Sequence, residues 1–153
     1  MTTQNLLEGL KTLLETEFKK SGIKLTSKEG EYIVPNVYIG FLPTTVNERD
    51  FPFVVIVPPA DAVDDEENNL LTITVVTGVK HADIGQEPVA FADILTLTER
   101  TKEILMQNNA LGAFARTGKV SWGVDAMAGV SVDISLGEIE VTYKTRSSYR
   151  GLR

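Results

Sequence analysis

The sequence contains no cysteine and a single histidine, His81, in 153 residues. The missing cysteines exclude disulfide frameworks, thiolate nucleophiles and cysteine-bound zinc or iron–sulfur sites. One histidine cannot assemble the clustered ligands that a transition-metal site requires. A general-base role for it would need a nucleophile or substrate within reach, which no motif indicates. We therefore interpret His81 as a loop residue and expect neither a metal nor another cofactor.

Long apolar runs and an excess of basic residues are also missing. Residues 1–20 interrupt their leucines with acids and lysines, so they resemble neither a signal peptide nor a membrane span. We expect a soluble, intracellular protein. The 15 Lys and Arg residues against 21 Asp and Glu residues give a net charge of −6. This balance argues against a nucleic-acid surface over the whole molecule, because such surfaces neutralise phosphates.

The charge that is present is unevenly distributed. An acidic link between two apolar segments carries five carboxylates, those of Asp61, Asp64, Asp65, Glu66 and Glu67. A basic tail, residues 144–153, contains no acid and has four cations, those of Lys144, Arg146, Arg150 and Arg153. The acidic link lacks the ligand spacing of a calcium loop, and adjacent carboxylates alone do not make a glycosidase. We interpret the link as a solvated hairpin loop that contacts a partner or a neighbouring subunit.

Two helices are expected from apolar residues at three- and four-residue spacing. The first lies in the opening residues, ends at Gly22 and buries Leu6, Leu10, Leu13, Leu14 and Phe18. The second begins at Pro88, which suits a first helical turn, and ends at Asn108 and Asn109. Its predicted buried stripe is Phe91, Ile94, Leu95, Thr98, Ile104 and Leu105.

The remaining segments have the composition of β-strands. Residues 53–57 and 70–79 are rich in β-branched side chains and are expected to pair antiparallel, with the first ending at Pro58 and Pro59. Residues 130–145 alternate with a period of two, and Gly129 and Gly137 indicate a turn or bulge there. The order of elements predicts an α+β fold: a mostly antiparallel or mixed β-sheet packed by two α-helices, in a single domain over residues 1–153.

No catalytic motif accompanies this pattern. Gly118 and Lys119 follow Gly112 at the wrong spacing for a phosphate loop and precede a strand, so we interpret them as part of a turn. Trp122 is typical of a core or rim position rather than a stacking platform. We expect a protein that is not an enzyme, with no catalytic residue, and we expect His81→Ala and Lys119→Ala to leave fold and function intact.

The sequence resembles the tail terminator family of long-tailed bacteriophages over nearly its whole length. The resemblance rests on the leucine-faced opening helix, the segment DFPFVVIV at 50–57 and the strand LLTITVV at 70–76. It also rests on the second helix from Pro88 and on a closing pair of strands that hold Trp122 and Tyr143.

Members of that family form six-fold rings that cap the head-proximal end of the tail tube, end its polymerisation and present the surface that joins the head. The resemblance implies a virion structural protein of the tail or neck, assembled in the host cytoplasm. Its implied partners are further copies of itself in a hexameric ring, the tail tube protein and a head-completion or neck protein. No membrane, specific nucleic-acid or cofactor contact is implied. Because a ring contact joins two different patches, the acidic link and the basic tail are candidate interface segments.

Other functions are compatible with the same pattern. One is a head-completion or tail-completion connector of a phage neck. Another is a small-molecule-binding regulatory α+β domain with the acidic link over a pocket, and an enzyme of unknown type ranks below both. A ring former is expected to have the mass of six subunits, whereas a regulatory domain is expected to be a monomer or dimer that a metabolite stabilises.

Overall fold

The computed structural model describes residues 3–25, 31–40, 51–59, 62–64, 69–80, 87–124 and 134–145, with the backbone alone for residues 62–64, 69, 87–90 and 145. Helices α1 and α2 span Thr3–Ser21 and Glu87–Gln107. The strands are β1 (Ile23–Lys24), β2 (Tyr32–Ile33), β3 (Asn36–Ile39), β4 (Phe53–Val57), β5 (Ala62–Asp64), β6 (Asn69–Lys80), β7 (Ala110–Leu111), β8 (Phe114–Val124) and β9 (Ile134–Thr145).

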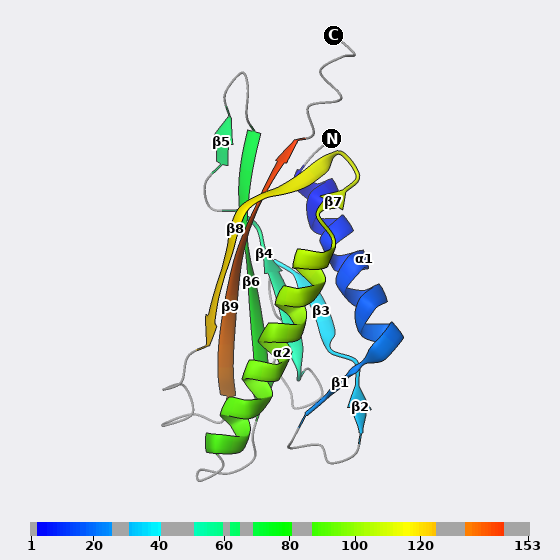
Figure 1. Ribbon diagram of the computed structural model, residues 1–153, viewed down its shortest axis with the longest axis vertical. Coiled ribbons are helices and arrows are strands. Elements are labelled where there is room, and N and C mark those ends of the chain that lie inside the picture. Colours follow the sequence, from blue (N-terminus) through cyan, green and yellow to red (C-terminus); the bar gives the residue numbers. More distant parts are fainter. Residues whose placement is uncertain are drawn as a thin grey trace.

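Strands β3 to β9 form one twisted sheet with the spatial order β3-β4-β6-β9-β8-β7, and β5 pairs with the start of β6 (Figure 1). Strands β3 and β4 are parallel, whereas the other paired strands of this sheet are antiparallel. The expected pairing of residues 53–57 with 70–79 is confirmed, and β4 ends at Val57, directly before Pro58. The predicted α+β class is therefore confirmed, with β6 and β9 as the long central strands.

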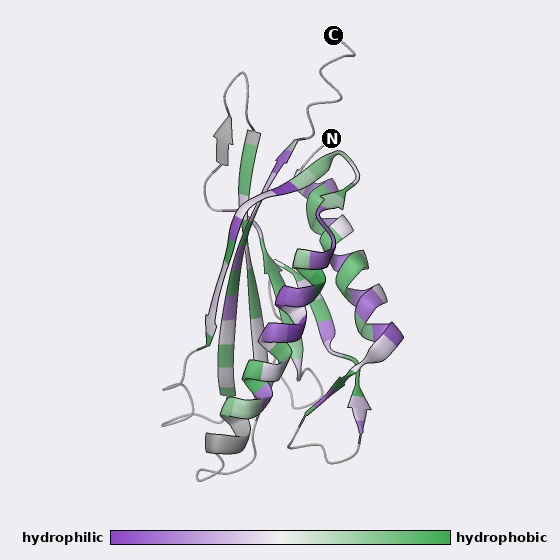
Figure 2. Ribbon diagram, in the orientation of Figure 1, coloured by the Kyte–Doolittle hydropathy of each residue, from purple (hydrophilic) through white to green (hydrophobic). Residues whose placement is uncertain are grey.

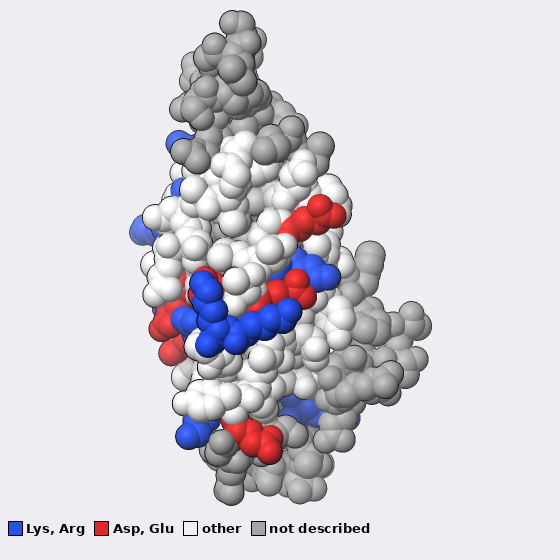
Figure 3. Space-filling view, turned by 90° about the vertical axis from the view of Figure 1, so that its right-hand side faces the viewer, with Lys and Arg blue, Asp and Glu red and all other residues white. Residues whose placement is uncertain are grey.

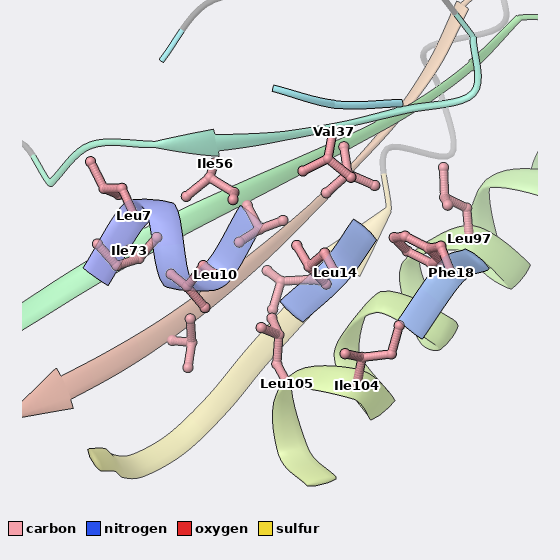
Figure 4. Close-up of a cluster of buried hydrophobic side chains, with 14 of the residues drawn as sticks. Leu7, Leu10, Leu14, Phe18, Val37, Ile56, Ile73, Leu97, Ile104 and Leu105 are labelled. Atoms are coloured by element: carbon pink, nitrogen blue, oxygen red, sulfur yellow. The ribbon is translucent and has the colours of Figure 1, made fainter. Parts of the chain in front are cut away.

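Both helices pack on the same face of this sheet, as the need to bury two apolar stripes requires (Figures 1 and 4). Helix α1 contributes Leu7, Leu10, Leu14 and Phe18, and the sheet contributes residues such as Ile56 and Ile73. The predicted stripe of α1 is confirmed except at Leu13, which is only partly buried, while Leu7 is buried instead. The helix ends as predicted at Gly22, which has φ 63° and donates its N–H to the Phe18 carbonyl over 2.6 Å.

The predicted stripe of α2 is partly wrong. Ile94, Thr98, Ile104 and Leu105 are buried, but Phe91 is 42% exposed and Leu95 is only half-buried. The core position belongs to Leu97, which lies beside Phe18 of α1 (Figure 4). A helix that touches both a sheet and another helix buries a wider arc than one apolar stripe, and the extra arc here includes Leu97. The C-terminus agrees with expectation, because the Asn108 side chain donates to the Ile104 carbonyl over 2.8 Å.

Gly137 marks neither a turn nor a bulge, contrary to the sequence interpretation, and Gly129 lies outside the described residues. Gly137 is an internal residue of β9, opposite Thr77 of β6 and Val124 of β8. A Cβ at this position would collide with the hydroxyls of Thr77 and Thr98, which hydrogen-bond each other over 2.8 Å. The glycine is therefore required where α2 approaches the sheet closely.

Segment 112–121, which includes Gly118 and Lys119, is expected from the sequence to be a turn, and only its first two residues fit that description. Gly112 and Ala113 form the turn between β7 and β8, but Phe114–Val124 is a continuous strand beside β9. Its register against β9 shifts between Thr117 and Ser121, where Gly118 has φ 73°. This irregularity is a β-bulge within a strand, and a positive φ makes glycine the natural residue there.

Candidate interaction surface on the outer face of the sheet

The surface of the sheet opposite α1 and α2, here called the outer face, carries a graded set of side chains. Along β9 its outward residues run from Leu136 through Glu138, Glu140 and Thr142 to Lys144, because they alternate with the buried residues of that strand. Hydropathy alternates visibly along the strands (Figure 2). The outer face is therefore apolar at one end of β9, acidic in the middle and basic at the other end.

Neighbouring strands extend this gradient across the sheet. Thr72 of β6 lies opposite Thr142, and their hydroxyls hydrogen-bond over 3.0 Å. Val76 lies opposite Glu138, and beyond Glu138 lies Gly123 of β8. The acidic and apolar rows of β9 thus have small or apolar neighbours on both sides, which leaves room above them.

That room is an open hollow of about 650 Å³, here called the outer hollow. Six outward-facing residues line it: Val76, Ser121, Gly123, Leu136, Glu138 and Glu140. Leu136 is 39% exposed and both glutamates are exposed. Residues two apart on one strand lie about 7 Å from each other, so the two carboxylates form one acidic spot beside an apolar floor. Within the described part of the chain, neither glutamate makes an ion pair.

The helix side of the molecule has a different character. There basic and acidic side chains lie next to one another over the helices (Figure 3). Examples are the Lys20–Glu17 pair at 3.2 Å and the Arg100–Glu103 pair at 3.6 Å. Such mixed charge suits a solvated surface, because exposed pairs of this kind contribute only about 0–1 kcal/mol each. The unpaired carboxylates on the outer face make that face the better candidate for an interaction.

Trp122 lies at the rim between the two sides, in agreement with the core or rim position expected for it. It is opposite the buried Ile139, so its side chain points toward α2, and it remains 39% exposed. The Lys102 ammonium lies 5.1 Å from the centroid of its ring. This cation–π contact joins α2 to β8, and Trp122 also borders the outer hollow.

Beyond its bulge, β8 is an edge strand within the described residues, since β7 pairs only with its first two residues. The edge includes exposed Lys119, which sequence analysis had assigned to a turn. Edge strands present unpaired backbone groups that invite another chain. The outer hollow therefore opens beside a strand edge.

Tyr143 belongs to the core and is not available for stacking on a ligand. It is fully buried opposite Arg116, and its hydroxyl has no hydrogen-bond partner among the described residues. Burial raises the pKa of this hydroxyl well above its ordinary value, and the nearby Arg116 guanidinium acts in the opposite direction.

The candidate interface residues of the sequence analysis are only partly placed. Asp61, Asp65, Glu66 and Glu67 of the acidic link lie outside the described residues, as do Arg146, Arg150 and Arg153 of the basic tail and His81. Asp64 is the last residue of β5, opposite Asn69, and Lys144 is an exposed residue near the end of β9. Since Val63 and Lys144 both lie opposite Leu70, the acidic link and the basic tail begin at the same end of the sheet.

Sequence reasoning missed the outer hollow. Glu138 and Glu140 occupy solvent-facing positions of an alternating strand, where charged residues are common, so neither indicates a site. The usable indication was Leu136, an apolar residue at a position of the alternation that faces solvent. Val76 and Gly123, which lie opposite Glu138, come from strands far away in the sequence, so the hollow appears only once the register is known.

Other candidate sites are weaker. A smaller hollow of about 170 Å³ lies between Asn5 and Gly9 of α1 and the hairpin residues Leu111, Gly112 and Phe114. The described residues contain no group of three or more side chains that could hold a metal ion. Among them, no helix is both long and apolar enough to cross a membrane. No protein-family model matches the sequence, and neither does any curated protein.

Proposed function

We propose that this chain is a structural subunit that assembles with copies of itself into a ring, and that the ring caps the head-proximal end of a phage tail tube. The observation that carries the proposal is the graded outer face, which is acidic and apolar at the outer hollow and basic where β9 ends. The resemblance of the element order to tail terminators supplies the identity of the assembly.

Opposite charges at the two ends of one face favour contact between unlike patches of two copies. Such heterologous contacts repeat from subunit to subunit and close into a ring when the rotation per subunit permits. In a two-fold dimer each copy can likewise set its acidic end on the basic end of the other, because residue i then contacts residue j and residue j contacts residue i. The charge pattern therefore supports self-association through unlike patches, and the mass of the assembly separates a ring from a two-fold dimer.

Sedimentation velocity combined with light scattering tests the assembly directly. We expect the mass of six subunits, reached at micromolar concentration and lost as the protein is diluted. Capping is tested by adding the protein to a polymerising tail tube protein and measuring tube lengths by electron microscopy. Tubes are expected to stop growing and to carry extra density at one end. A protein that stays monomeric at every concentration and leaves tube length unchanged contradicts the proposal.

A neck connector is the nearest alternative, and it differs in which partner it binds. Capture on purified heads without any effect on tube growth would favour the connector. A regulatory domain is a further candidate, because the volume of the outer hollow lies in the range of about 300–1,000 Å³ that small-molecule sites occupy. For that function we expect a monomer or dimer whose melting temperature rises with a cationic metabolite.

A further inference from the structure

The outer hollow needs an occupant that is both basic and apolar. Its walls present two exposed carboxylates, those of Glu138 and Glu140, beside the apolar side chains of Leu136 and Val76. Carboxylates pair best with guanidinium groups, which bind them in two-pronged geometry. A leucine or tyrosine close to an arginine would cover the apolar floor at the same time.

The chain itself contains a segment of this composition. Residues 146–153, RSSYRGLR, hold three arginines together with Tyr149 and Leu152 and contain no acid. In an extended segment, residues two apart share a side, so Arg150 and Leu152 would match Glu138 and Leu136, which are also two apart. Arg146 would fall on the same side.

We propose that the outer hollow of one copy binds residues 146–153 of the basic tail of a neighbouring copy. This inference rests on the self-association in the proposed function and names the contact that produces it.

The length of residues 146–153 determines whether the tail can reach the outer hollow of its own chain or only that of a neighbouring copy. Leu136 is nine residues before the end of β9, which is about 30 Å along the strand, and Glu140 is about 17 Å from that end. Strand β9 runs away from the hollow, so its own tail would have to reverse direction first. A reversal uses about four residues, and the remaining four span at most about 14 Å. The main chain stops just short of Glu140 and far short of Leu136, so the chain's own tail cannot bring a side chain onto the apolar floor, and the hollow is filled from another subunit.

Binding in this way is directional. Each copy offers one hollow and one tail, and these lie toward opposite ends of the same face. In a ring every subunit gives its tail to one neighbour and receives a tail from the other, whereas in a dimer two subunits exchange tails, and the mass of six subunits identifies the ring. Charge attraction guides the tail, and burial of Leu152 against Leu136 and Val76 supplies the apolar contribution.

Charge reversal on the full-length chain tests the contact. A hollow-reversed variant carries Glu138→Lys and Glu140→Lys, and a tail-reversed variant carries Arg146→Glu and Arg150→Glu. Each variant alone is expected to self-associate roughly tenfold or more weakly than the parent, because like charges now meet at every contact. A control variant, Glu8→Lys and Glu15→Lys on α1, changes the net charge as much as the hollow reversal and is expected to associate like the parent.

Mixing the two reversed variants is the decisive measurement. In an alternating assembly each lysine-bearing hollow meets a glutamate-bearing tail, and each native hollow meets a native tail. An equimolar mixture is therefore expected to regain the parent's mass in sedimentation velocity. If either folded variant associates like the parent, or if the mixture does not reassemble, the inference is wrong. Thermal melting checks the fold of each variant, and if the hollow-reversed chain does not fold, the tail-reversed chain decides alone.

The same data separate this inference from the proposed function. A parent that forms rings and caps tubes, with reversed variants that do likewise, overturns only the tail-in-hollow contact. A parent that stays monomeric and leaves tubes unaffected overturns both.

Discussion

At Gly137 the sheet has no space for a side chain, because the Thr77 and Thr98 hydroxyls occupy the position that a Cβ would take. We expect Gly137→Ala to lower the free energy of unfolding by about 1–3 kcal/mol, since a methyl group there forces apart the buried Thr77–Thr98 pair. Urea denaturation monitored by circular dichroism measures this loss.

Gly123 provides the matched control for that substitution. It lies on β8, opposite Glu138, and a Cβ added there would meet no atom of the described residues within 4 Å. Gly123→Ala is therefore expected to change the free energy of unfolding by less than about 0.5 kcal/mol. Equal losses for the two variants would show that the closeness of α2 to Gly137 is not what costs stability.

Tyr143 gives the fold a weakness at high pH. Burial raises the pKa of its hydroxyl in the folded chain, whereas the unfolded chain ionises near pH 10. Above that pH the unfolded state releases a proton that the folded state keeps, so stability falls as pH rises. We expect Tyr143→Phe to flatten the fall of the urea midpoint between pH 9 and pH 11.

At pH 7 the same variant is expected to be nearly neutral. The Tyr143 hydroxyl has no hydrogen-bond partner among the described residues, so removing it costs little. A large loss of stability at pH 7 would mean that the hydroxyl makes a hydrogen bond of consequence, and an unchanged alkaline profile would mean that other groups cause the fall.

At the scale of elements, α2 buries Leu97 fully in the core, whereas Leu95 is only half-buried. We expect Leu97→Ala to cost about 2–5 kcal/mol, the usual range for a fully buried leucine, and Leu95→Ala to cost clearly less. Thermal or urea denaturation of the two single variants makes the comparison within one turn of one helix. A larger cost at Leu95 would contradict the orientation of α2.

Most elements were predictable because local physics specifies them. The leucine spacing and Gly22 define α1, and the alternation in residues 134–145 defines β9 and its buried residues Ile139, Val141 and Tyr143. The errors arose where a distant element decides the outcome. Neither the role of Gly137 nor the orientation of α2 can be read locally, because both depend on how closely the helix approaches the sheet.

The start of β8 illustrates the same limit. Segment 112–121 contains glycines that favour a turn, yet pairing with β9 continues the strand through Gly118. The turn preference is visible only as a β-bulge at that residue. Sheet pairing is a long-range interaction, so it overrides a local turn preference. The outer hollow was unpredictable for this reason as well, since it is formed where β6, β8 and β9 meet.

At the scale of the whole molecule, charge is graded along the outer face of the sheet and mixed over the helices on the other side, as Figure 3 shows. The acidic link begins beside the basic tail, on the other side of β6. In the proposed assembly the outer hollow receives the basic tail, and the acidic link stays a candidate contact with a partner or a neighbouring subunit. Of the residues described, Asp64 at the end of β5 and Lys144 near the end of β9 lie at the same end of the sheet.

The acidic link is accordingly expected to steer association rather than to hold it. We consider a variant in which Asp64, Asp65, Glu66 and Glu67 are replaced by Ser or Asn, compared with a matched change of Arg146, Arg150 and Arg153. Exposed ion pairs contribute about 0–1 kcal/mol each, and salt at 0.1 M screens them beyond about 10 Å.

The acidic-link variant should associate more slowly than the parent at low salt and like it at high salt. The arginine variant should associate more weakly at both, because it also loses contacts inside the hollow. Stopped-flow light scattering over a salt series measures both effects, and if the acidic-link variant matches the parent at every salt concentration, the link is only a solvated loop.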